Sequence, residues 1–163
     1  MIQETQVEAF KLLRRRRIRK RKALKAWQHL TEEYFLRHTP EEIAWHTEVL
    51  AENDTDSPYG LVDVRRQQEG DGIEAMIYSP RSQRTFAPAT ALLAELGMTI
   101  MDVRIVPLAN DFSLDTYIFM ELDHRTEIDD ARLTKIRRVL NTVLTSGDDT
   151  AAVVTRPAPR QVR

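Results

Sequence analysis

Histidines and carboxylates are the first side chains to consider for chemistry, because they serve as metal ligands and as general acids and bases. The 163-residue sequence contains His29, His38, His46 and His124 and no cysteine. None of these histidines stands at a metal-ligand spacing from a carboxylate or from another histidine, so ordinary surface or packing roles are expected. Without cysteine, disulfide bonds and thiolate catalysis are excluded. We therefore expect no catalytic residue and no metal site in this chain.

A dense basic run is the second feature that could do chemistry. It comprises Arg14, Arg15, Arg16, Arg17, Arg19, Lys20, Arg21, Lys22 and Lys25. Such a run is typical of surfaces that bind phosphate or nucleic acid. It lacks interleaved aromatic side chains for base stacking. The preferred interpretation is therefore a solvated helix, or one that rests against an acidic neighbour or another part of a larger protein.

Composition limits the class of protein. The chain is 42% hydrophobic with a net charge of −1, and its length allows one domain with an appendage. No apolar run approaches the ~20 residues that a membrane-spanning helix requires. The N-terminus also lacks the apolar core of a signal peptide. We expect a cytoplasmic protein with no membrane partner.

The N-terminal part of the sequence predicts helices. Residues 5–37 carry apolar side chains at helical spacing without glycine or proline, which predicts one long basic helix. A second helix over residues 40–52 begins with Thr39-Pro40-Glu41-Glu42, a capping box with proline at the first helical position. The polar residues 53–59 predict a linker. Residues 1–58 are therefore assigned to a helical linker segment.

Two strands are predicted between Thr99 and Met120, joined by a tight turn at Asn110 and Asp111. In a two-residue turn Ala109 faces Phe112, and the cross-strand pairs are Ile105 with Thr116, Val103 with Ile118 and Met101 with Met120. That face is apolar and is expected to share a core with Leu93 and Leu140. The opposite face carries Asp102, Arg104, Asp115 and Tyr117. Arg104 and Asp115 are diagonal neighbours there, which predicts a structural ion pair at the surface.

The order of elements predicts the fold. From residue 73 onward, a strand at 73–79, a helix at 86–96, the hairpin and a last helix opening at 123–126 leave one strand missing from a βαββαβ unit. A further strand is predicted at residues 61–66. Either residues 61–66 or residues 151–155 could fill that edge, and 61–66 is preferred because it forms a hairpin with the next strand. The expected class is α+β and ferredoxin-like, an antiparallel sheet with two helices on one face. This domain is assigned residues 59–147, followed by a flexible tail at 148–163.

Three stretches resemble the ACT-domain region of the bifunctional PII uridylyltransferase/uridylyl-removing enzymes. They are EEYFLRHTPEEIAWHT, the strands GLVDVRR and IEAMIYSP, and LLAELGMTIMDVRI with FSLDTYIF. The resemblance covers about residues 30–144. It implies the first ACT domain of that family together with the helical segment that precedes it.

The resemblance implies a regulatory, non-catalytic fragment that takes part in glutamine-linked control of nitrogen metabolism. Its partners would be the nucleotidyltransferase and HD domains of a parent chain, which would use Mg and UTP elsewhere, so no cofactor is expected here. A homodimer through the ACT domain is also implied. The alternatives are a stand-alone ACT module for amino-acid sensing or dimerisation, and a nucleic-acid-binding protein that uses the basic helix.

The resemblance also places an effector site. The corresponding residues are Arg81, Ser82, Arg84, Thr85, Thr99 and Asp102. The family's loop reads Asp-Arg-Pro-Gly-Leu, and its glycine falls on Arg84, where a Cβ hinders close approach of the backbone to an amino acid. A purely structural loop is therefore preferred over glutamine binding, although the two arginines could hold a carboxylate or phosphate.

Overall fold

The computed structural model describes residues 1–53, 55–56, 58–123 and 127–145. Its helices and strands are α1 (Ile2–Arg15), α2 (Lys20–Ala26), α3 (Glu32–Arg37), α4 (Pro40–Glu52), β1 (Leu61–Arg66), β2 (Ile73–Pro80), α5 (Phe86–Glu95), β3 (Met98–Pro107), β4 (Phe112–Glu121) and α6 (Asp130–Asn141). Short 3-10 helices follow α2, β2 and α6. The described helices include none that is long and apolar enough to cross a membrane.

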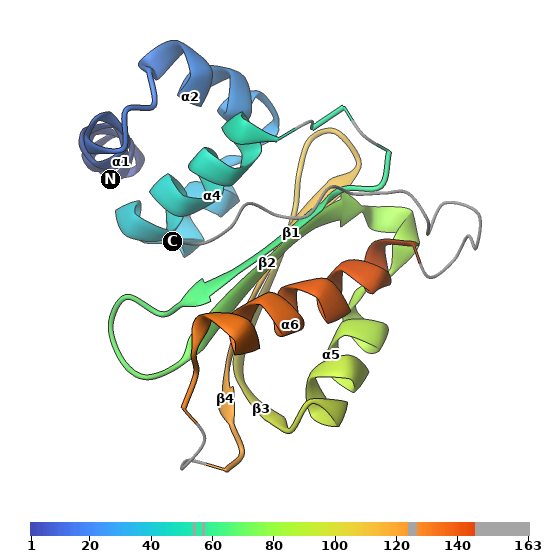
Figure 1. Ribbon diagram of the computed structural model, residues 1–163. Coiled ribbons are helices and arrows are strands. Elements are labelled where there is room, and N and C mark those ends of the chain that lie inside the picture. The colour runs from blue at the N-terminus through green and yellow to red at the C-terminus, as the bar shows by residue number, and fades with distance from the viewer. Residues whose placement is uncertain (54, 57, 124–126, 146–163) are drawn as a thin grey trace.

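The strands form a four-stranded antiparallel sheet in the order β1-β2-β4-β3. β1 occupies the edge beside β2 that the last strand of a βαββαβ unit would take, so residues 61–66 fill the missing position, as preferred from the sequence (Figure 1). Residues 151–155 and the tail 148–163 lie outside the described residues. The α+β, ferredoxin-like class is confirmed.

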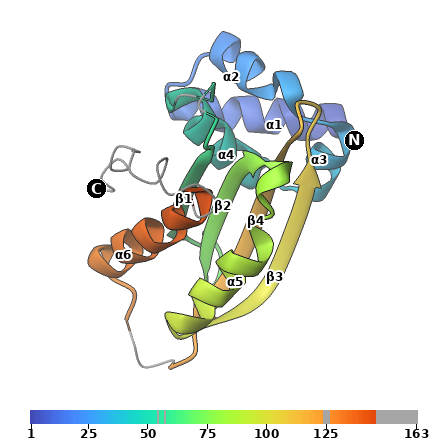
Figure 2. The same ribbon diagram turned by 90° about the vertical axis from the view of Figure 1, so that its right-hand side faces the viewer.

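Helices cover both faces of the sheet. α5 and α6 lie side by side on one face, as expected, and α1 to α4 gather on the other (Figure 2). The packing of α1 to α4 on the sheet was not expected, because the sequence assigned these residues to a linker. One apolar cluster joins α1 to α4 with sheet residues such as Met76, Val106 and Leu114, and another joins α5 and α6 with residues such as Ala75 and Phe119. The helical segment therefore shares a core with the sheet.

The prediction of one long helix over residues 5–37 is wrong. α1 ends at Arg15, and Arg17 takes a left-handed conformation with a φ of 64°. Ala9 and Leu13 lie on the buried stripe of α1, and a continued helix would carry Arg16 or Arg17 onto that stripe. The break instead buries Ile18 and leaves Arg17 exposed. The second helix begins as predicted, with both hydrogen bonds of the capping box at Thr39.

The predicted register of the β3–β4 hairpin is wrong by one residue. Ile105 pairs with Asp115 and Val103 with Tyr117. The loop contains three residues instead of two, because the amide of Leu108 donates to the carbonyl of Phe112 at 2.8 Å. Asp111 adopts a φ of 63°, the left-handed position that a three-residue hairpin loop requires.

A one-residue shift moves side chains to the other face of a sheet. Asp115 and Tyr117 therefore share a face with Ile105 and Val103 and are buried. Met101 and Ile105 are exposed and not in the core, at 59% and 43%, because both lie on the edge strand β3, Met101 at its bulge. Leu93 and Leu140 are buried as expected, and Val103 packs against them partly buried. β4 is an interior strand with helices over both faces, so neither of its faces is solvated.

The last helix starts later than predicted. Asp129 caps α6, its carboxylate accepting from the amide of Arg132 at 2.8 Å. Residues 124–126, within the predicted start, lie outside the described residues. The boundaries assigned at residues 58, 59 and 147 remain predictions.

Candidate functional site: a buried polar junction

A chain of buried polar side chains crosses from α3 through α4 to β4. The hydroxyl of Tyr34 lies 2.6 Å from Nδ1 of His46, and Oγ1 of Thr116 lies 3.4 Å from Nε2 of the same ring. All three side chains are almost fully inaccessible to solvent. If Tyr34 donates to Nδ1, the proton on Nε2 is free to donate to Thr116, which satisfies the whole chain.

Burial keeps these groups neutral. It lowers the pKa of His46 well below its usual value, and the nearby charges of His38, Arg65 and Arg104 lower it further. Burial also raises the pKa of Tyr34 well above 10.0, with Glu42 adding to the effect. A neutral histidine and a protonated tyrosine are the states that the hydrogen-bonded chain requires.

An ion pair lies beside the hydrogen-bonded side chains of Tyr34, His46 and Thr116. Arg104 of β3 donates to both carboxylate oxygens of Glu42 in α4, at 2.9 and 2.8 Å, and to the carbonyl of Arg37 at 2.9 Å. Burial acts to raise the pKa of Glu42, but the hydrogen bonds from Arg104 and from the amide of Thr39 outweigh it, so the pKa is lowered. Bidentate pairs of this kind fix orientation as well as distance.

His38 is the remaining member of this group of polar side chains. Its ring stacks on Tyr34 at 4.4 Å, and its Nδ1 donates to the carbonyl of Tyr34 at 2.8 Å. Burial lowers its pKa. Within the described part of the chain, its Nε2 has no hydrogen-bond partner. We call these six residues the junction: Tyr34, His38, Glu42, His46, Arg104 and Thr116.

Asp63 of β1 extends the junction around the edge of the sheet. Its carboxylate accepts from Nε1 of Trp45 in α4 at 3.1 Å and from Nε of Arg137 in α6 at 3.0 Å. Arg137 also donates to the carbonyl of Val64 at 2.7 Å. One carboxylate thus joins helices that cover opposite faces of the sheet.

The basic run is partly anchored to α4. Arg16 donates to Glu41 at 2.6 Å and to Glu48 at 3.2 Å, and Nε1 of Trp27 donates to Thr47 at 2.7 Å. These contacts agree with the interpretation that the run rests against an acidic neighbour, here within the chain itself.

The structure does not bring the six predicted effector residues together. Arg81, Ser82 and Arg84 are exposed, and Thr85 is buried, in the loop after β2. Pro80 pairs with Phe112, whereas Thr99 pairs with Met120 at the far end of β4. Eight residues of strand between these points correspond to roughly 26 Å.

The predicted ion pair between Arg104 and Asp115 is also wrong. The two side chains point to opposite faces of the sheet, and Arg104 pairs with Glu42 and, at 3.3 Å, with Asp102. Asp115 instead accepts from the hydroxyl of Ser113 at 2.5 Å. Burial raises the pKa of Asp115 to about 6, although the Ser113 hydrogen bond opposes this. The one-residue register error accounts for the misplacement.

The residues of the junction were missed as a site. His38 and His46 are packing residues, as expected, and His124 lies outside the described residues. A signal was present, since Tyr34, His38, Glu42 and His46 recur at every fourth position. The described residues hold no group of three metal-ligating side chains. The arrangement can hold elements in one register, and its two hydroxyl groups, those of Tyr34 and Thr116, are buried away from solvent.

Comparison with known proteins gives several matches. A family model described as the fifth domain of the uridylyltransferase GlnD matches residues 1–49. The bifunctional uridylyltransferase/uridylyl-removing enzyme of Ectopseudomonas mendocina is 34% identical over 165 residues, which cover 99% of this chain and 18% of that protein. The enzyme of the same name from Acinetobacter baylyi is 33% identical over 140 residues, covering 85% of this chain and 16% of that protein. No solved structure matches.

The chain therefore spans less than a fifth of the length of these relatives, since the match covers 18% of the first. The matches to both relatives include the junction and the sheet, whereas the family model ends within α4. They confirm the family resemblance that the sequence predicted.

Proposed function

We propose, from the premise that this chain is a relative of one segment of the bifunctional uridylyltransferase/uridylyl-removing enzymes, that it is a regulatory, non-catalytic ACT module of such an enzyme. It would act in the cytoplasm, in glutamine-linked control of nitrogen metabolism through the PII protein. The catalytic domains of the parent chain, with their Mg and UTP, would be its partners.

The junction is the observation that carries this proposal. It ties α3 and α4 to β3 and β4 through buried, directional hydrogen bonds, among them the bidentate pair of Glu42 and Arg104. Buried polar networks specify one arrangement of the elements they join. A change at the sheet would therefore reach the helices without being absorbed by side-chain rearrangement.

Asp63 supports the same role. Because it accepts from Trp45 in α4 and from Arg137 in α6, a displacement of either helix acts on the other. Coupling of this kind needs two arrangements with different affinity for an effector, and we propose that the effector binds elsewhere in the parent chain.

The loop after β2 keeps a left-handed backbone conformation at Arg84, the position that corresponds to the family's glycine. Arg84 holds a left-handed conformation, with φ 48° and ψ 63°. The amide of Arg81 donates to the carbonyl of Asp111 at 2.9 Å, which fixes the loop to the β3–β4 turn. The loop is thus fixed in position, but its exposed side chains do not enclose an amino acid.

The test is a chimera in which this chain replaces the matching segment of the Ectopseudomonas mendocina enzyme, with uridylyl transfer and removal measured against glutamine. We expect both reactions to persist and to respond to glutamine. Tyr34→Phe, which removes one junction hydrogen bond, should weaken the response and leave the glutamine-free rates unchanged. Tyr78→Phe is the matched control, because it loses a hydroxyl bond to Asn110 outside the junction. An equal response in both variants would contradict the proposal.

Calorimetric titration of the isolated chain with glutamine tests where sensing occurs. We expect no saturable heat at millimolar glutamine, because Arg84 occupies the position of the family's glycine. Saturable binding would place sensing in this loop and overturn that interpretation.

Dimerisation is a second proposed role, favoured by one observation. β3 is a ten-residue edge strand, and Met101, Ile105 and nearby Phe86 are exposed beside it, at 59%, 43% and 46%. Long edges with apolar side chains favour pairing with another chain. Light scattering should give twice the monomer mass, and Ile105→Lys should return the mass to that of the monomer.

A further inference from the structure

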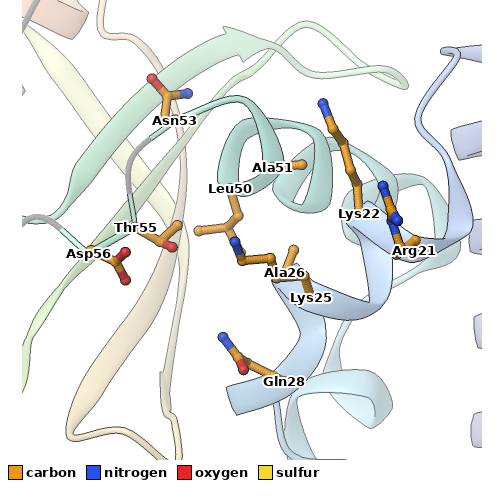
Figure 3. A pocket seen from close by; sticks show the side chains of 10 residues that line it. All are labelled: Arg21, Lys22, Lys25, Ala26, Gln28, Leu50, Ala51, Asn53, Thr55 and Asp56. Carbon is orange, nitrogen blue, oxygen red and sulfur yellow. The ribbon is translucent and has the colours of Figure 1, made fainter.

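α2 and the C-terminal end of α4 border an open pocket that the proposed regulatory role does not use. Its volume is about 480 Å³, within the usual range for small-molecule sites. It is lined by Arg21, Lys22, Lys25, Ala26, Gln28, Leu50, Ala51, Asn53, Thr55 and Asp56. Figure 3 shows side chains of α2 on one side and the end of α4 with the following loop on the other.

The pocket carries uncompensated positive charge. Arg21, Lys22 and Lys25 make no ion pair within the described part of the chain, in contrast to Arg16 of the same basic run. Asp56 is the one carboxylate among the lining residues. A hollow lined mainly by one sign of charge concentrates ligands of the opposite sign.

The remaining lining residues suit an organic group. Leu50, Ala26 and Ala51 provide apolar surface, and Gln28, Asn53 and Thr55 provide amide and hydroxyl groups. In Figure 3 the Lys25 side chain reaches across toward Leu50, so the charge and the apolar surface adjoin. Three cations and one carboxylate leave two positive charges, which a phosphate monoester would neutralise and a monocarboxylate would not.

We propose that this pocket binds a small organic phosphate. Lys22 and Lys25 supply ammonium groups and Arg21 supplies a planar guanidinium, the groups that recognise phosphate in proteins. The organic part lies against Leu50 and the adjoining alanines. This inference goes beyond the proposed function, because the pocket lies on the helical segment and not at the loop after β2.

A ligand here would also bear on the sheet. A smaller cavity, of about 20 Å³, shares Lys25, Gln28, Leu50 and Thr55 with the pocket and continues to Tyr78 and Leu108. The amide of Ala109, next to Leu108, donates to the carbonyl of His29 at 3.1 Å. Occupancy would thus restrict movement between α2, α4 and the β3–β4 turn.

The experiment is titration of the chain with adenosine 5′-monophosphate, followed by calorimetry and by amide NMR shifts. We expect saturable binding, with shifts at Ala26, Leu50 and Thr55, and at least about tenfold weaker binding of inorganic phosphate because it lacks the organic part. Equal affinity for the two ligands would overturn the assignment to an organic phosphate. Absence of saturable binding at millimolar concentration would overturn the site itself.

A pair of double variants separates the pocket from general attraction to a basic surface. Lys22→Gln with Lys25→Gln should weaken binding by about tenfold or more. Arg14→Gln with Arg15→Gln removes the same charge from exposed residues of α1 outside the pocket, and should change affinity by less than about twofold. Circular dichroism checks that both variants fold. Equal losses would contradict the proposal, as would RNA competing better than the monophosphate.

Discussion

Apolar clusters cover both faces of the sheet, but the two faces differ in the polar contacts beneath their helices. The face under α5 and α6 is mainly apolar, and its cluster includes Val64, Ala75, Leu93, Phe119 and Ile136. The face under α3 and α4 carries the junction, with a buried ion pair and a buried neutral histidine. Apolar contact is non-directional, whereas hydrogen-bonded networks accept one arrangement. The comparison indicates that the junction positions the helical segment. On the other face the polar contacts lie at α6, where Arg132 pairs with Glu121 and Arg137 with Asp63.

The largest effect should come from breaking the ion pair of the junction. Glu42→Ala leaves the partly buried Arg104 without its main partner, which costs up to about 3–5 kcal/mol of unfolding free energy. Urea denaturation measures the loss. Glu33→Ala, which removes the exposed pair with Arg37, should cost less than about 1 kcal/mol. Similar losses in the two variants would show that the pair of Glu42 and Arg104 is no stronger than an exposed ion pair.

The face under α5 and α6 contains the buried carboxylate of Asp115, and removing its charge should stabilise the protein. The pKa of Asp115 rises from 3.8 to about 6 on folding, so ionising it at pH 8 costs about 3 kcal/mol. Asp115→Asn should therefore be more stable than the parent chain at pH 8 by up to that amount. Because the folded pKa is raised, the parent chain loses stability as the pH rises from about 4 to 6. A variant no more stable at pH 8 would show that the carboxylate is solvated.

Acid should act on the junction in the opposite sense. The pKa values of His38 and His46 are lowered by burial, so below pH 6.5 the unfolded state binds more protons than the folded state. The folded state therefore loses stability as the pH decreases, by up to about 1.4 kcal/mol per pH unit for each histidine. The measurement is denaturation between pH 7 and 5 in the Asp115→Asn background, which removes the opposing titration. His46→Gln should reduce the slope, and an unchanged slope would show that His46 does not contribute.

The smallest effect is expected at the loop after β2. Arg84→Gly should relieve a left-handed conformation that costs about 1–2 kcal/mol. Because glycine loses more conformational entropy on folding, the expected net gain in unfolding free energy is about 0.5 kcal/mol. Thermal unfolding measures the gain. Arg81→Gly is the control, because Arg81 lies in a 3-10 turn without positive φ, and there glycine should destabilise. A loss of stability in Arg84→Gly would show that the Arg84 side chain makes contacts worth more than the strain.

The sequence predicted those features that depend on local chemistry. The capping box at Thr39 and the edge position of residues 61–66 follow from short patterns, and both are present. The predicted register of the β3–β4 hairpin was wrong because two-residue and three-residue loops around Asn110 use the same residues and differ by one position. The junction could not be derived, since Glu42 and Arg104 are 62 residues apart and a pattern of charges does not reveal its partner.

The placement of β1 has a consequence for how the chain folds. With the edge strand ahead of β2, two of the three strand pairings, β1 with β2 and β3 with β4, are hairpins between consecutive strands. The pairing of β2 with β4 is the one that must close over an intervening helix and strand. A topology dominated by such short-range closures lowers contact order and favours rapid folding. Each hairpin can form as soon as its own residues leave the ribosome, so the sheet need not wait for the end of synthesis to acquire its edge.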